Sequence, residues 1–186
     1  MTDVDASGDA IPNILGDGGS DVSVGAVRPT LPDAGRLFRV FCAVDPVDDP
    51  LVHSAVAVLS VWVRHYESRR RPMLGRLAGQ LDLYIYLIDC HAEDIMANHS
   101  SNLAADEMHY TYGEHVALLT SDFVRYKGEQ SSQGGVTDDQ ALHHHRHWRG
   151  FDTMVAAVHA GTVRLKPPRD PSSPRFTAPR HPRLVD

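Results

Sequence analysis

The chain has 186 residues and a formal net charge of −6, from 18 basic and 24 acidic side chains. This length predicts one domain with appendages rather than two domains. The acidic balance argues against a surface built to bind nucleic acid. No apolar run reaches the roughly 18 residues of a membrane span, and the first residues lack the basic and apolar regions of a secretory signal. With only Cys42 and Cys90 in the chain, a disulfide framework is excluded, and we expect a cytoplasmic protein.

The two ends of the chain differ in composition from its middle. Residues 1–35 contain six aspartates and one arginine, Arg28, which predicts a flexible acidic arm. Residues 164–186 contain six of the 12 prolines and six of the 18 basic residues, which predicts an extended tail. Two interpretations remain open, namely solvated tails or arms that join a homo-oligomer or bind a protein partner. The folded domain is then expected over residues 36–163.

Apolar side chains recur with helical spacing through most of this domain. The spacing predicts helices over residues 50–70, 72–98, 101–127 and 138–163. Asp49 is the expected N-cap of the first helix, and Thr137 with Gln140 forms a capping box for the last. Asp106 and Glu107 fall in the early turns of the third helix, where the helix dipole favours acidic side chains.

Four helices joined by two short links and one longer loop favour an antiparallel arrangement. We therefore predict an all-α protein, an up-down-up-down four-helix bundle with extended N- and C-terminal arms. Residues 36–44 are apolar but too few to assign to a helix or a strand. No segment shows convincing period-two alternation, so almost no β structure is expected.

Three carboxylates on the helix predicted over 72–98 fall on one stripe of its surface. At about 100° per residue, Asp82, Asp89 and Glu93 lie within about 40° of one another, with apolar residues on both sides. We therefore expect all three to point inward. A buried carboxylate is costly unless it meets a cation, a metal, a histidine or its own proton.

The helix predicted over 138–163 offers partners for these acids. His145, Asp152 and His159 follow its apolar face at seven-residue steps, and His144 also points inward. In an up-down bundle this helix runs parallel to the 72–98 helix across the diagonal, so the two polar stripes are expected at matching levels.

Histidine is unusually frequent, with 12 residues in the chain, and a few of them extend the set of candidate ligands. Carboxylates and imidazoles that converge inside a bundle are the ligands of iron, manganese and zinc sites. The predicted metal ligands are Asp82, Asp89, Glu93, His109, His115, His145, Asp152 and His159. The Glu-x-x-His pairs of diiron bundles are absent, and so are the common nucleotide-binding and hydrolase motifs.

Two functions follow from this pattern. The first is a small helical-bundle metalloprotein or metal-dependent enzyme that uses the inward histidines and carboxylates. The second is a non-catalytic interaction or assembly protein, in which the same groups form a buried structural network and the arms bind partners. Whether the protein is an enzyme stays open at this point.

Overall fold

The computed structural model describes residues 29–68, 73, 75–97, 99 and 102–169. Within these residues the chain is mainly helical, and β structure is limited to one pair of two-residue strands. The elements in chain order are α1 (Ala34–Phe41), α2 (Pro50–Glu67), α3 (Arg76–Met96), β1 (Asp106–Glu107), α4 (Tyr112–Gln130), α5 (Asp138–His159) and β2 (Val163–Arg164). The all-α class is therefore confirmed. The described part contains five helices instead of four, because most of the additional helix α1 lies in the unassigned apolar segment 36–44.

The predicted helix starts at Pro50 and Asp138 are confirmed, because both are fixed by side-chain caps. Asp49 accepts a hydrogen bond from the amide of Val52 at 2.8 Å. Thr137 and Gln140 form the expected capping box of α5. These caps satisfy amide groups that would otherwise lack partners at a helix N-terminus.

The expected helix over 101–127 was wrong at its N-terminal end. Its first third is not helical, and Asp106 and Glu107 form β1, which pairs in parallel with β2. The helix α4 starts only at Tyr112, because Thr111 and Glu114 build a capping box there. The acidic residues that suggested a first helical turn therefore belong to a long connection between α3 and α4.

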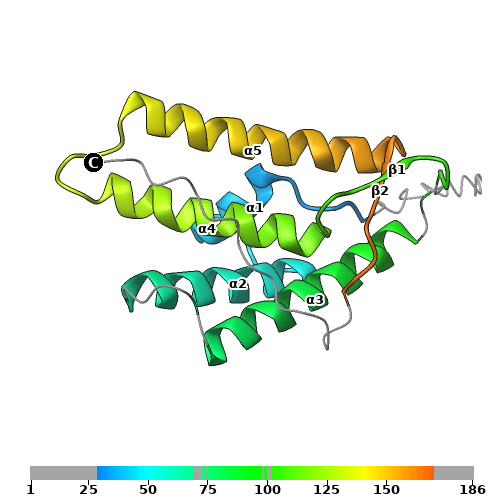
Figure 1. Ribbon diagram of the computed structural model, residues 1–186, viewed down its shortest axis with the longest axis horizontal. Coiled ribbons are helices and arrows are strands. Elements are labelled where there is room, and N and C mark those ends of the chain that lie inside the picture. Colours follow the sequence, from blue (N-terminus) through cyan, green and yellow to red (C-terminus); the bar gives the residue numbers. More distant parts are fainter. Residues whose placement is uncertain (1–28, 69–72, 74, 98, 100–101, 170–186) are drawn as a thin grey trace, which may run out of the picture.

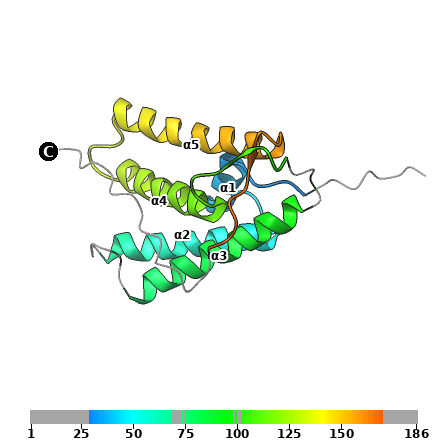
Figure 2. The same ribbon diagram turned by 45° about the vertical axis from the view of Figure 1, so that its right-hand side comes forward.

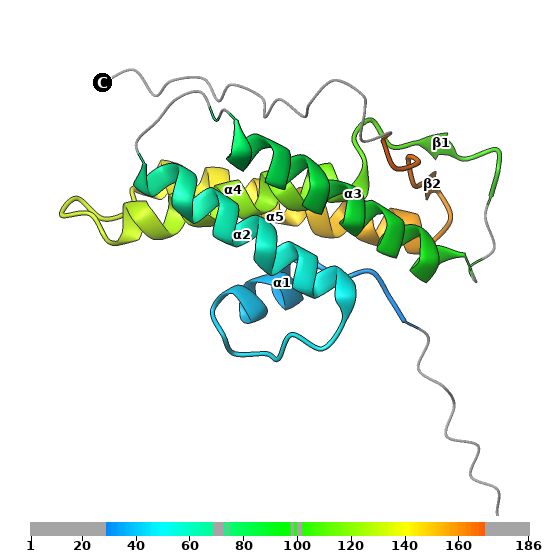
Figure 3. The same cartoon turned by 90° about the horizontal axis from the view of Figure 1, so that it is seen from below.

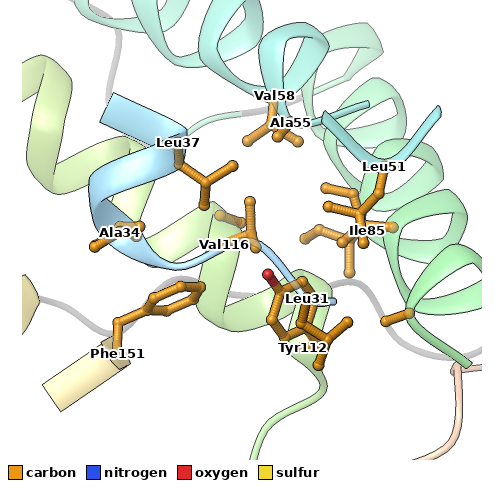
Figure 4. Close-up of a cluster of buried hydrophobic side chains, with 14 of the residues drawn as sticks. Leu31, Ala34, Leu37, Leu51, Ala55, Val58, Ile85, Tyr112, Val116 and Phe151 are labelled. Carbon is orange, nitrogen blue, oxygen red and sulfur yellow. The ribbon is translucent and has the colours of Figure 1, made fainter. Parts of the chain in front are cut away.

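The helix α4 lies at the centre of the molecule, between the α2–α3 pair on one side and α5 on the other (Figures 1 and 2). The short helix α1 packs beside α2 and also contacts α5 (Figure 3). Figure 4 shows the core where these helices meet. Its fully buried side chains include Leu37, Val58 and Val116, and Ile85 and Phe151 are nearly so.

The burial pattern corrects the orientation expected for α3. Its buried face is centred on Leu81, Ile85 and Ile88, which pack toward α2 and α4. Leu83, on the opposite flank of the predicted stripe, is 51% exposed. The stripe of carboxylates therefore runs along the edge of the buried face and not through its centre. No helix within the described ranges is long and apolar enough to cross a membrane.

Candidate functional site

The eight predicted ligands do not meet at one site. The helix α4 packs between α3 and α5 over most of their length, and these two helices approach each other only at their C-terminal ends (Figure 1). Of the three α3 carboxylates, Asp89 is buried, Asp82 is half-buried and Glu93 is exposed. The diagonal contact expected from an up-down bundle was the wrong premise, because α4 occupies the space between the two stripes.

The histidines of the predicted set are likewise dispersed. His145 is exposed on α5, and His109 is exposed on the connection before α4. His115 is half-buried on α4, with its ring edge-on to Tyr110 at 5.6 Å between centroids. Burial, together with the nearby rings of His147 and His109, lowers the pKa of His115 to about 4. His115 is therefore neutral at pH 7.

Asp89 acts as a cap for the neighbouring helix. Its Oδ1 accepts a hydrogen bond of 2.5 Å from the amide of Gly113, in the first turn of α4. A Cβ atom on residue 113 would collide with the carbonyl oxygen of Ile85, so the close approach of α3 and α4 requires glycine there. Asp89 thus supplies a partner to an amide group that α4 itself cannot satisfy.

The burial of Asp89 also changes its protonation. Burial raises the pKa of this carboxyl to about 7, although the amide of Gly113 and the side chain of Thr111 oppose the shift, and the charges of Glu114 and Glu93 raise it further. Its second oxygen, Oδ2, has no hydrogen-bond partner within the described part of the chain. Desolvation without a counter-ion favours the neutral acid, which is the physical reason for the raised pKa.

Glu114 is fully buried and lies near enough to Asp89 for the two charges to interact. Its Oε2 accepts a hydrogen bond from the amide of Thr111 at 2.9 Å, which completes the capping box. Its Oε1 lies 2.8 Å from Nη2 of Arg169, in the segment that follows β2. Two buried carboxylates, Asp89 of α3 and Glu114 of α4, therefore lie at the first turn of α4, together with one arginine that comes from far along the chain.

Asp152 and His159 hold the segment that leads into α1. The amide of Ala34 donates to Oδ1 of Asp152 at 2.8 Å, and the amide of Leu31 donates to Nε2 of His159 at 3.1 Å. The lone pair of His159 Nε2 is thus already engaged as an acceptor. Asp152 is exposed and His159 is half-buried, so the inward orientation expected for this stripe is wrong for Asp152 and only partly correct for His159. Their partners are backbone amides and not the α3 carboxylates.

A second buried polar cluster joins α4 to α5. His144 is 1% exposed, and its Nδ1 lies 2.8 Å from Asp122 Oδ2 while its Nε2 lies 3.1 Å from Glu129 Oε2. Arg125 Nη2 donates to Asp122 Oδ1 at 2.7 Å, and His147 Nδ1 lies 3.5 Å from Oδ2. Only an imidazolium donates from both nitrogens at once, so this geometry fits a charged His144 between two carboxylates.

The histidines beside Asp122 determine its charge. Burial alone would raise the pKa of this carboxyl, but His147 and His144 outweigh burial and hold the pKa well below its usual range. The rings of Tyr126 and Trp148 lie 5.1 and 5.9 Å from the ring of His144 and cover it from the solvent. In this cluster each acid contacts at least one base, while Nε of Arg125 and Nδ1 of His147 make no hydrogen bond among the described residues.

A shallow pocket of about 250 Å³ lies where the C-terminal ends of α3 and α5 approach each other. Glu93, Met96, His99, Val158 and Leu165 are among the residues that line it. Glu93 is the one residue of the predicted set at this pocket. Across the described ranges, no group of three or more His, Cys, Asp or Glu side chains is arranged to hold a metal ion.

Several residues of these networks were not identified from the sequence. They are Thr111, Tyr112, Glu114, Asp122, Glu129 and Arg169, and the hydroxyl of Tyr112 donates to the carbonyl oxygen of Pro32 at 2.7 Å. The motif Thr-x-x-Glu at 111–114 is a capping-box signal and could have placed the start of α4 correctly. For Arg169 no local pattern exists, because its partner is distant in sequence.

Comparisons with protein-family models, with curated proteins and with solved structures find no match for this chain.

Proposed function

We propose that this protein is a non-catalytic interaction or assembly protein whose inward polar residues form structural networks. One observation carries the proposal: the buried acids and histidines are engaged by backbone amides or by one another. Asp89, Asp152 and His159 each accept a hydrogen bond from an amide at or just before the start of another helix. Such contacts fix how helices dock and leave few ligand atoms available for a metal or a substrate.

The terminal arms are the proposed means of binding, either to a second copy of the chain or to another protein. The described end of the C-terminal arm supports this role, because its basic residues already make ion pairs with acids of the folded part. Arg164 Nη2 lies 3.1 Å from Glu107 Oε2, and Arg169 reaches Glu114. We also propose a cytoplasmic location, which the free thiols of Cys42 and Cys90 support.

The experiment that separates this function from the metalloprotein alternative is elemental analysis of protein purified without an affinity tag. We expect iron, manganese and zinc well below one equivalent, with no difference between the wild type and the variants Asp89→Asn and His145→Ala. A stoichiometric metal that is lost in either variant would overturn the proposal and favour the metalloprotein. His53→Ala is a matched control, because His53 is an exposed histidine outside the predicted set.

The assembly role has its own test. Light scattering of the full chain and of a variant that lacks residues 1–28 and 170–186 would show whether the arms join copies. We expect the full chain to have the larger apparent mass or to capture a partner that the shortened variant does not. An identical monomer in both cases, without a captured partner, would contradict the assembly role.

A further inference from the structure

The segment that follows α5 runs beside the connection that precedes α4. Val163 pairs with Asp106 and Arg164 with Glu107 in a parallel register. The amide of Met108 then donates to the carbonyl oxygen of Arg164 at 3.1 Å. We call residues 163–169 the C-terminal strap and residues 106–114 the docking strip. Figures 1 and 3 show their strands β1 and β2 side by side near the C-terminal end of α3.

Basic side chains of the strap contact the docking strip at three points along its length. After the ion pair of Arg164 with Glu107, Nζ of Lys166 donates to the carbonyl oxygen of His109 at 2.9 Å. The guanidinium of Arg169 then reaches Glu114, at the point where the strip enters α4. Pro167 and Pro168 lie between these cations and favour an extended backbone that has little entropy to lose on binding.

The arginines of the strap and Glu114 of the docking strip differ in how deeply they are buried. The Arg164 and Arg169 side chains are 44% and 41% exposed, so each contact on the strap side is partly solvated. Ion pairs of this kind contribute little individually and exchange readily. The Glu114 side chain is fully buried, and the enclosed Asp89 has an oxygen without a described partner. The contact of Arg169 with the enclosed Glu114 is therefore the charge-specific contact of the strap, whereas Val163 and Leu165 pack against the hydrophobic core.

We propose that the docking strip is a binding site for an extended, arginine-bearing segment of a partner protein, and that the C-terminal strap occupies it when the partner is absent. This inference rests on the proposed function and names the chemistry of its partner. The partner would be recognised in two ways: it would add a strand to β1, and one of its arginines would form an ion pair with Glu114. Arginine is favoured over lysine because its planar guanidinium presents several N–H donors and is more weakly hydrated than an ammonium group, and its Nη2 reaches Oε1 of the enclosed Glu114.

The test uses a fluorescent peptide with the sequence of residues 161–169 and measures its binding to the full chain by fluorescence anisotropy. In the variant Arg169→Ala the strap loses the arginine that contacts Glu114, so the peptide should bind up to about fivefold more tightly than to the wild type, as expected for one partly exposed ion pair. Arg149→Ala is the matched control, because Arg149 is an exposed arginine on α5. It should bind the peptide as the wild type does.

Substitutions in the peptide keep the test independent of protein folding. Replacing the last arginine of the peptide by lysine should weaken binding to Arg169→Ala, and replacing it by alanine should weaken it by up to about fivefold. Glu114→Gln in the protein should remove the preference for arginine. The proposal is overturned if the Arg169→Ala chain does not bind the peptide, or binds the alanine peptide equally well. Metal content and apparent mass are unaffected by that outcome, so the proposed function would be judged separately.

Discussion

Two buried aspartates lie along α4, and burial has opposite consequences for them: Asp89 of α3 contacts its first turn, and Asp122 lies near its middle. At the N-terminal end, Asp89 has an amide as its donor and carboxylates as its charged neighbours, and its pKa is raised to about 7. Near the middle of α4, Asp122 is surrounded by His144, His147 and Arg125, and its pKa is lowered. The comparison shows that the neighbours, and not the depth of burial, decide whether an enclosed carboxyl carries a charge.

The largest effect is expected from Asp122→Ala. This change leaves His144 and Arg125 enclosed with only Glu129 as a counter-ion, and removing one member of a buried ion pair costs about 3 to 5 kcal/mol. Urea unfolding at pH 7 measures the loss. Asp139→Ala, an exposed aspartate on α5, is the control and should change stability by less than about 0.5 kcal/mol. A loss below about 1 kcal/mol for Asp122→Ala would mean that the network is not a buried ionic cluster.

At the first turn of α4, Asp89→Asn should change how stability depends on pH. The pKa of Asp89 in the folded protein is about 7, above its ordinary value of 3.8, so the folded state keeps a proton that the unfolded state has lost. The wild type therefore loses up to about 1.4 kcal/mol per pH unit as the pH rises through this window, and the loss levels off above pH 7. The carboxamide of the variant does not titrate, so the variant should lack this slope. Parallel pH profiles for both proteins would contradict the raised pKa.

Gly113→Ala tests the close approach that places Asp89 against α4. The added Cβ collides with the carbonyl oxygen of Ile85, and an overpacked contact of this kind costs about 1 to 3 kcal/mol. The matched control is Gly79→Ala on α3, where the new Cβ has open space. This control should stabilise the protein by about 0.5 to 1 kcal/mol, because glycine disfavours a helix interior. Equal effects of the two changes in thermal unfolding would exclude the close contact.

The smallest effect is expected from Glu129→Gln, at the solvent edge of the polar cluster around Asp122 and His144. The Glu129 side chain is 23% exposed, in contrast to Asp122, which is fully enclosed. Its contact with His144 is therefore partly screened, and we expect a loss of about 0.5 to 1 kcal/mol by urea unfolding. A loss as large as that of Asp122→Ala would show that both carboxylates are equally essential.

The sequence was sufficient for features that depend on neighbouring residues. The caps at Asp49 and Thr137 were predicted correctly, because each follows from local spacing. The inward position of Asp89 also follows from helical phase. These are properties of single helices, and their physics is local.

The candidate site could not be predicted in the same way. Periodicity shows that a residue faces the interior, but not which neighbouring helix it meets there. Asp89 was matched to His145 and Asp152 on α5, whereas its actual donor is Gly113 on α4. Asp122 was overlooked because its role depends on His144, which lies on the next helix. Such pairings depend on the packing order of the helices, which no single segment encodes.

The hydrogen bonds of the segment before α1 and the ion pair of Glu114 have a consequence for how the chain folds during synthesis. The hydrogen bonds of Leu31 and Ala34 cannot form until His159 and Asp152 have been synthesised. The ion pair of Glu114 cannot form until Arg169 has been synthesised. Contacts between residues so distant in sequence raise the contact order well above that of a simple helical hairpin. The helices can form as they leave the ribosome, but the segment before α1 is held in place only after α5 has been made.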